Sequence, residues 1–155
     1  METKHTYEVR AKSTRARSGV VASDAIPTPV VFSAPPEFAG EPHVWTPEHF
    51  FVAAVVTCYV STFSGMSEVS RFPFVSLEVD ADGVIEKDAN GWKFTEIRLH
   101  PTLKVAHEED CERGLRLLEK AERDCLIARS LTARISLAPS IKVTPEVAEA
   151  VHGLA

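Results

Sequence analysis

The chain has 155 residues, of which 45% are hydrophobic and 25% are charged, and its formal net charge is −5. This length and composition predict one globular domain, residues 1–155, with a hydrophobic core. The acidic balance without a basic stripe argues against a nucleic-acid partner. The sequence starts without an apolar secretion signal, and its longest apolar run, residues 50–60, is shorter than a membrane helix. We therefore expect a cytoplasmic protein with no membrane partner.

Three cysteines occur at positions 58, 111 and 125. They form no CxxC motif, and neither they nor the six histidines show the spacing of a zinc site, so the sequence predicts no metal. In a reducing cytosol, a disulfide between two such cysteines is more often transient and catalytic than structural.

The N-terminal third predicts three strands, over residues 5–11, 20–25 and 28–32, with a polar turn at 15–18. Residues 33–45 contain three prolines and predict an irregular loop. A helix should then begin at Thr46-Pro47-Glu48, which combines a capping residue, a proline at the first helical position and an acidic first turn. We expect it to extend to about residue 69.

This helix is apolar on nearly every side from residue 50 to residue 60, which predicts burial all round. A monomer of this size rarely encloses one helix so completely. We therefore expect a second subunit to supply part of its cover.

The second half predicts a strand over 74–86, a tight turn at Asp88-Ala-Asn-Gly91 and a partner strand over 92–105. A helix opens near His107, and one of its faces carries Leu115, Leu118, Ala121 and Cys125. A last strand over 131–137 and a short terminal helix from Thr144-Pro145-Glu146 complete the chain. Helices grouped against a mostly antiparallel sheet make the predicted fold class α+β.

Cys58 is the candidate reactive residue. A thiol reacts as thiolate, and burial alone opposes that form, so the site needs a cation or hydrogen-bond donors. Cys58 lies about three turns into its helix, beyond the help of the N-terminus, which makes Arg15 or Arg17 the candidate cation and Glu48 its orienting partner. Ten residues of helix, about 15 Å, separate Glu48 from Cys58, which favours a composite site across a dimer interface.

Cys125 should point inward and could resolve an oxidised Cys58, whereas Cys111 lies in an exposed first turn. Each residue also has a structural interpretation. Cys58 could be core filler, the arginines could be solvated loop charges, and Glu48 could serve only the start of the helix. Another cysteine-dependent reaction, such as thioester hydrolysis, would need a histidine base, for which His43 and His49 are the nearest in sequence.

The whole chain resembles the OsmC/Ohr family of organic hydroperoxide reductases. The resemblance rests on Pro47-Glu48 followed ten residues later by Cys58 in Val-Ala-Ala-Val-Val-Thr-Cys, and on Ala-Glu-Arg-Asp-Cys125-Leu-Ile-Ala-Arg-Ser-Leu before the last strand. The loop Ala-Pro-Pro-Glu-Phe-Ala-Gly-Glu is also similar. The chain departs from the pattern at Thr46, where many members carry Asn or Ser. It departs again after Cys125, where the peroxidase branches usually have Pro-Val-Ser.

The resemblance implies an intertwined homodimer with long central buried helices and a site at the interface. It implies that Cys58 is the peroxidatic thiol, that Cys125 is the resolving thiol and that Glu48 pairs with an arginine of the N-terminal loop. Arg17 fits this loop better than Arg15. The implied partners are an organic hydroperoxide and a dithiol reductant such as a lipoyl protein, with no cofactor.

The sequence therefore predicts a thiol peroxidase whose Cys58 sulfenic acid is resolved as a Cys58–Cys125 disulfide. Apolar groups at Phe50, Phe51, Val55 and Tyr59 should favour alkyl peroxides. The alternative is a non-catalytic, dimeric protein of the same fold that binds a small molecule or serves in a stress response.

Overall fold

The computed structural model describes residues 3–145 of the chain. They form two compact units, one ending at Phe51 and one starting at Val52. Both helices and strands are present, and the predicted α+β class is confirmed.

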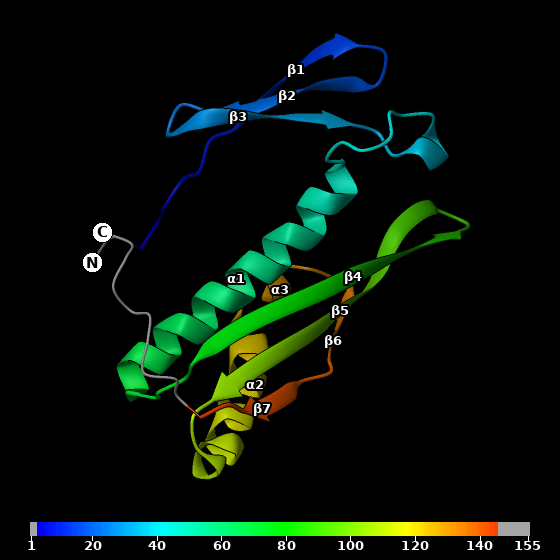
Figure 1. The fold of residues 1–155 in the computed structure, drawn as a ribbon. Coiled ribbons are helices and arrows are strands. Elements are labelled where there is room, and N and C mark those ends of the chain that lie inside the picture. Colours follow the sequence, from blue (N-terminus) through cyan, green and yellow to red (C-terminus); the bar gives the residue numbers. More distant parts are fainter. Residues whose placement is uncertain (1–2, 146–155) are drawn as a thin grey trace. The chain divides into compact units, whose positions relative to one another are not determined.

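The first unit contains an antiparallel sheet of three strands, β1 (Arg10–Arg15), β2 (Ser18–Ser23) and β3 (Ile26–Ser33), in chain order (Figure 1). The three expected strands are confirmed, although the first begins five residues later than predicted. Pro27 and Pro29 lie within β3, at the edge of this sheet, where the missing N–H groups of proline are tolerated.

The loop after β3 contains a short 3-10 helix, η1 (Pro36–Phe38), and leads to the long helix α1 (Pro47–Ser70). The predicted helix over 47–69 is confirmed. The Thr46 hydroxyl accepts the His49 N–H at 3.2 Å, and the His49 ring nitrogen Nδ1 accepts the Thr46 N–H at 3.3 Å. This reciprocal arrangement is a capping box in which histidine takes the place of glutamate.

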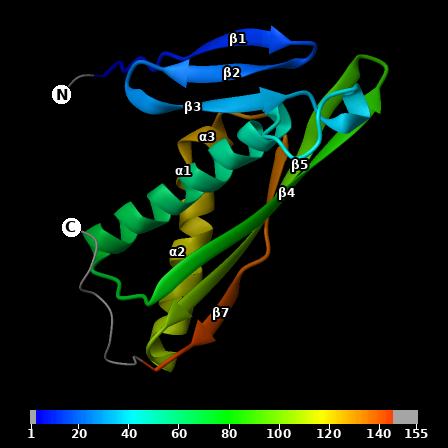
Figure 2. The ribbon, with the colours of Figure 1, turned by 45° about the horizontal axis from the view of Figure 1, so that its top comes forward.

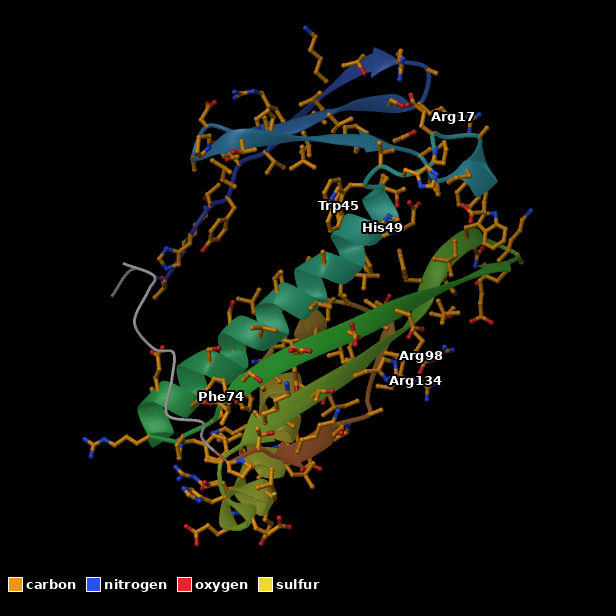
Figure 3. The ribbon with its side chains drawn as sticks, viewed as in Figure 1. Arg17, Trp45, His49, Phe74, Arg98 and Arg134 are labelled. Carbon is orange, nitrogen blue, oxygen red and sulfur yellow. The ribbon has the colours of Figure 1, made fainter. Side chains whose placement is uncertain are left out.

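A second interaction stabilises the same helix start. The ring of Trp45, just before the cap, stacks on the ring of Phe50 with centroids 5.6 Å apart (Figure 3). The positions of these rings, one residue before the cap and in the first turn, are those of a hydrophobic staple. Local side chains therefore determine where α1 begins.

The second unit is built on β4 (Ser76–Asp88) and β5 (Gly91–Val105), an antiparallel pair joined at the predicted tight turn. Gly91 has φ of 113°, which glycine adopts without strain. Two further strands, β6 (Arg134–Leu137) and β7 (Ser140–Val143), pair with β5 in parallel. This sheet is thus less antiparallel than expected, and β7 was not predicted, because four residues leave no readable alternation.

Between β5 and β6 the chain forms η2 (Glu108–Asp110), α2 (Cys111–Asp124) and α3 (Leu126–Arg129). Leu118 and Ala121 are buried on α2 as predicted, but Leu115 is partly exposed. Gly114 is buried in its place, and a Cβ there would approach the Leu103 side chain at 2.7 Å. The absence of a side chain at position 114 lets α2 lie close to the sheet.

Helices α1 and α2 cover the same face of this sheet (Figure 2). A Cβ at Gly83, opposite Ile97, would meet the Val52 side chain of α1, while Leu103 faces α2. Ile97 and Leu103 point to one side of β5, because they lie an even number of residues apart. The core between sheet and helices is completed by aromatic and aliphatic side chains, namely Val55, Tyr59, Phe63, Phe72, Leu99 and Val105.

Within the single chain, α1 is buried on one side only, and the prediction that a second subunit covers the rest stays a prediction. Its buried residues form one stripe, Val55, Tyr59, Phe63 and Ser67. Over its full length α1 is long and apolar enough to span a membrane by length and composition alone, which the run of residues 50–60 did not reveal. The core helix of a soluble protein meets the same test. The predicted helix after Thr144 lies outside the described residues.

We predict that Thr46→Ala lowers the free energy of unfolding by about 1 kcal/mol, because the substitution removes the side-chain acceptor at the start of α1. The matched control is Ser70→Ala, at the exposed end of the same helix, where the hydroxyl donates to the Met66 carbonyl oxygen. Urea unfolding at one fixed protein concentration measures both variants. Equal losses in the two would contradict the capping role.

Candidate functional site

Cys58 and Cys125 meet in the second unit. Cys58 lies midway along α1 and is half-buried, whereas Cys125 is fully buried in the single residue that separates α2 from α3. The two thiols are hydrogen-bonded to each other and both are free. The Cys125 sulfur also lies 4.0 Å from the Val55 carbonyl oxygen of α1.

The surroundings of Cys58 favour the thiolate. Partial burial acts to raise the pKa of Cys58, but hydrogen bonds from the Ile127 N–H, the Cys125 thiol, the Thr62 hydroxyl and the Leu126 N–H outweigh it. The net result is a pKa below the ordinary value of a cysteine. The Thr62 oxygen, one turn further along α1, lies 4.0 Å from the Cys58 sulfur.

The surroundings of Cys125 have the opposite effect. Burial raises the pKa of Cys125 to about 11, and although the Ala128 N–H opposes this, the neighbouring Cys58 reinforces it. Cys125 therefore keeps its proton at neutral pH and can donate it in a hydrogen bond to the Cys58 thiolate. One thiol of the pair is poised to lose its proton and the other to hold it.

The donors that act on Cys58 come from the turn after Cys125. Cys125 has extended backbone angles, φ of −62° and ψ of 115°, and α3 begins directly after it. The first N–H groups of a helix have no partner inside that helix, so those of Leu126 and Ile127 are available to the sulfur. Sequence reasoning assigned this role to an arginine and missed these donors, because a helix of four residues has no readable pattern.

The charged residues predicted for the site all lie in the first unit. Glu48 is in the first turn of α1, and its Oε2 atom is buried with no hydrogen-bond partner among the described residues. Arg17, at the turn between β1 and β2, donates to the Phe38 carbonyl oxygen (Figure 3). Arg15 makes two hydrogen bonds to Glu41. The structure thus leaves Glu48 without the predicted arginine.

The four predicted apolar contacts differ in their surroundings, and Val55 is completely buried. Phe50 stacks on Trp45, which is 51% exposed, and Phe51 is half-buried. Tyr59 is completely buried, and its hydroxyl donates to the Leu118 carbonyl oxygen at 3.1 Å. Tyr59 is therefore a core residue that ties α1 to α2 and has no surface left for a substrate.

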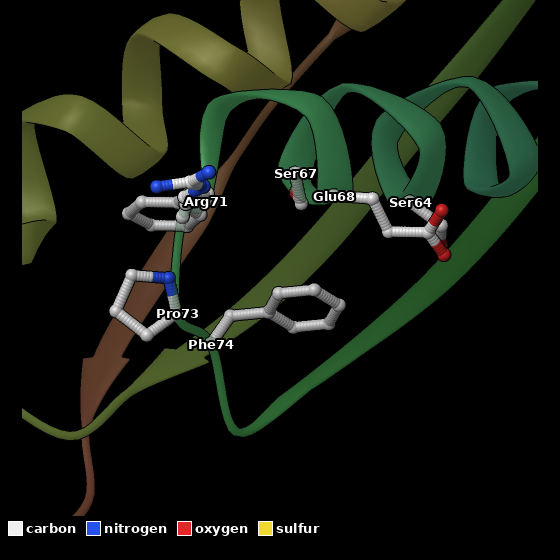
Figure 4. A pocket seen from close by; sticks show the side chains of 7 residues that line it. Ser64, Ser67, Glu68, Arg71, Pro73 and Phe74 are labelled. Carbon is white, nitrogen blue, oxygen red and sulfur yellow. The ribbon is translucent and has the colours of Figure 1, made fainter.

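A hollow of about 460 Å³ lies at the far end of α1 (Figure 4). Seven residues line it, namely Ser64, Ser67, Glu68, Arg71, Phe72, Pro73 and Phe74. Neither cysteine is among them, so this hollow is separate from the thiol pair. Within residues 3–145, no three His, Cys, Asp or Glu side chains are grouped as metal ligands.

We predict that Leu126→Pro raises the pKa of Cys58, because proline removes one N–H donor. Proline suits the first helical position, and the backbone angles of Cys125 suit a residue before proline. The Leu126 side chain is 67% exposed, so Leu126→Ala is a control that keeps the N–H. Iodoacetamide labelling of Cys58 across pH, in a Cys111→Ser background, gives the midpoint. The same labelling midpoint in the background protein, Leu126→Pro and Leu126→Ala would refute the role of this N–H.

Comparison with known proteins agrees with the fold. Residues 40–140 match the family of OsmC-like proteins. The uncharacterized protein YmaD of Bacillus subtilis (strain 168) is 25% identical over 108 residues, covering 68% of this chain and 72% of its own.

Several solved structures share the architecture. An OsmC-like protein of unknown function from Vibrio cholerae aligns with a TM-score of 0.77 at 18% identity, covering 88% of this chain and 99% of its own. An organic hydroperoxide resistance protein from Elizabethkingia anophelis aligns with a TM-score of 0.72 at 23% identity, covering 93% and 100%. OhrB of Bacillus subtilis aligns with a TM-score of 0.65 at 18% identity, covering 89% and 98%. With the family match spanning most of the chain, this protein belongs to the OsmC-like family.

Proposed function

We propose that this protein is a cysteine-based peroxidase that reduces organic hydroperoxides. The observation that carries the proposal is the contact between Cys58 and Cys125, in which hydrogen bonds lower the pKa of one thiol and burial raises that of the other. Such a pair provides a nucleophile and a protonated partner within reach of it. Structural relatives described as organic hydroperoxide resistance proteins support this choice of substrate.

In the proposed reaction, the Cys58 thiolate attacks the terminal peroxide oxygen and breaks the O–O bond. The alkoxide leaves and takes a proton from solvent to become an alcohol, while Cys58 becomes a sulfenic acid. The Cys125 sulfur then attacks the Cys58 sulfur, and the hydroxyl group leaves with the Cys125 proton as water. The peroxide is reduced by two electrons, and the cysteine pair is oxidised to a disulfide.

A dithiol must then reduce the Cys58–Cys125 disulfide by thiol–disulfide exchange, and we propose a lipoyl protein for this role. No organic cofactor or metal takes part in this cycle. A reducing cytoplasm fits such a thiol pair, since structural disulfides are uncommon there.

We further propose that the protein acts as a homodimer. The exposed positions of α1 include four small residues spaced along one side of the helix, Ala54, Thr57, Ser61 and Gly65. Only 22% of the most apolar window of α1 is buried inside the chain. An apolar helix left this open favours a partner, and small side chains let another helix approach closely. A second copy offers the same surface, as two-fold symmetry requires.

In the proposed dimer, the second copy supplies the charged and apolar groups that Cys58 needs. Arg17 would stabilise the thiolate and the developing oxygen charge, and Glu48 would hold the guanidinium in place. Phe50 and Phe51 would contact the alkyl part of the peroxide.

We predict that one equivalent of cumene hydroperoxide converts the protein to a form lighter by two hydrogen atoms. Peptide mapping should locate a Cys58–Cys125 disulfide. Cys58→Ser should keep its thiols, whereas Cys111→Ser should react like the unsubstituted protein. Intact mass and thiol counts measure all three. Free thiols after minutes of exposure to the hydroperoxide would contradict the peroxidase proposal and favour the non-catalytic, small-molecule-binding alternative.

We predict that Gly65→Arg converts the dimer to a monomer without unfolding it, because a Cβ at position 65 meets no atom within 4 Å in the chain itself. The control is Glu119→Arg, which places the same side chain on an exposed position of α2. Light scattering coupled to size-exclusion chromatography gives the mass. A dimer that survives Gly65→Arg would show that this side of α1 is not the interface.

A further inference from the structure

Two arginines of the first unit, Arg15 and Arg17, are unevenly paired with two of its carboxylates, Glu41 and Glu48. Arg15 donates to Glu41 through Nε at 3.1 Å and through Nη2 at 2.9 Å, the geometry of a two-pronged ion pair. The Ser18 hydroxyl also donates to Glu41 at 2.8 Å. These bonds, Ser18 first and Arg15 second, lower the pKa of Glu41.

The same cluster is tied to the backbone. The Glu41 N–H donates to the Ser33 hydroxyl at 2.8 Å, and Ser18 bonds to Ser33 at 3.1 Å. Both serines are buried. Glu41, which holds Arg15, therefore joins the ends of β1, β2 and β3 to the following loop. Moving the Glu41–Arg15 pair would break several hydrogen bonds together.

Arg17 and Glu48 are left with weaker arrangements. The exposed Arg17 bonds to one neutral acceptor, the Phe38 carbonyl oxygen, and Glu48 has one buried oxygen with no hydrogen-bond partner among residues 3–145. A carboxylate adds charge–charge attraction to the hydrogen bond of a guanidinium, and an unpaired buried acceptor carries a penalty. Exchange of the Phe38 carbonyl for the Glu48 carboxylate is therefore favourable for both groups.

The backbone places this exchange within reach. The Arg17 carbonyl oxygen accepts the Ala34 N–H, and the Ser33 N–H donates to the Trp45 carbonyl oxygen, both at 3.0 Å. Three segments thus lie side by side, and the outer two are about 10 Å apart, since hydrogen-bonded neighbours are separated by about 4.8 Å. Glu48 follows Trp45 by less than one helical turn. The long side chain of Arg17 and the carboxylate of Glu48 can close such a gap together.

We propose that Glu41 is a positioning residue that decides which arginine serves the site: it holds Arg15 and thereby leaves Arg17 to pair with Glu48. The catalytic role of the Arg17–Glu48 pair rests on the proposed peroxidase function. The selection by Glu41 depends only on contacts within the first unit.

Carbon-13 NMR of the Glu48 carboxyl, at one neutral pH in the intact protein, tests this proposal without any peroxide. Arg17→Met should shift the Glu48 carboxyl resonance, because it removes the cation that pairs with this group, and Arg15→Met should leave the resonance unchanged. Adding Glu41→Gln to Arg17→Met should recover at least half of the shift, because the released Arg15 takes the place of Arg17.

The matched control adds Glu37→Gln to Arg17→Met, which removes an exposed carboxylate of the same loop and should recover nothing. A Glu48 resonance that moves equally with Arg15→Met, or that does not move with Arg17→Met, would overturn the assignment of Arg17. Failure of Glu41→Gln to recover the shift would overturn the role of Glu41. The expected resonance shifts in a protein inert to peroxides would support the selection and reject only the peroxidase function.

Discussion

Inside the second unit, the Tyr59 hydroxyl donates a hydrogen bond to the Leu118 carbonyl oxygen at 3.1 Å, with both groups shielded from water. This contact ties α1 to α2 in the middle of the core, where an unpaired hydroxyl would cost free energy. Cys58 is the residue before Tyr59, and Cys125 follows the end of α2 by one residue. The position of both thiols therefore depends on how these two helices pack, and the Cys125 sulfur at 4.0 Å from the Val55 carbonyl oxygen belongs to the same contact.

The chemistry of the pair follows from unequal surroundings. Both sulfurs are partly or fully removed from water, and burial disfavours the thiolate at each. The thiolate of Cys58 is nevertheless favoured, because its sulfur faces the N–H groups of Leu126 and Ile127. Cys125, which begins the same turn, is more deeply buried. Because a Cys125 that keeps its proton can donate to the Cys58 thiolate, the raised pKa of one residue helps to lower that of the other. The turn that carries Cys125 therefore makes Cys58 the more acidic thiol of the pair.

Local sequence signals predicted the parts of the fold that depend on local chemistry. The cap at Thr46 and the Asn90-Gly91 turn fixed the start of α1 and the β4–β5 hairpin, because few residue types satisfy those backbones. Features set by tertiary packing were missed. Leu115 lies on the periodic face of α2 yet is partly exposed, since Gly114 brings the helix close to Leu103. Likewise, the family resemblance and the inward face of its helix pointed to Cys125 as the partner of Cys58, but the donors beside them depend on a four-residue helix that no periodicity reveals.

The start of α1 combines a structural and a proposed chemical role in neighbouring residues. Thr46 and His49 satisfy the free backbone groups there, and Trp45 covers the first turn by stacking on Phe50. Glu48, between them, takes no part in capping, although the positive end of the helix favours a carboxylate at this position. Since its neighbours already stabilise the helix start, Glu48 is free to keep one buried oxygen unpaired. A polar atom left in this state inside an otherwise satisfied turn is the kind of local exception that folded proteins retain at functional positions.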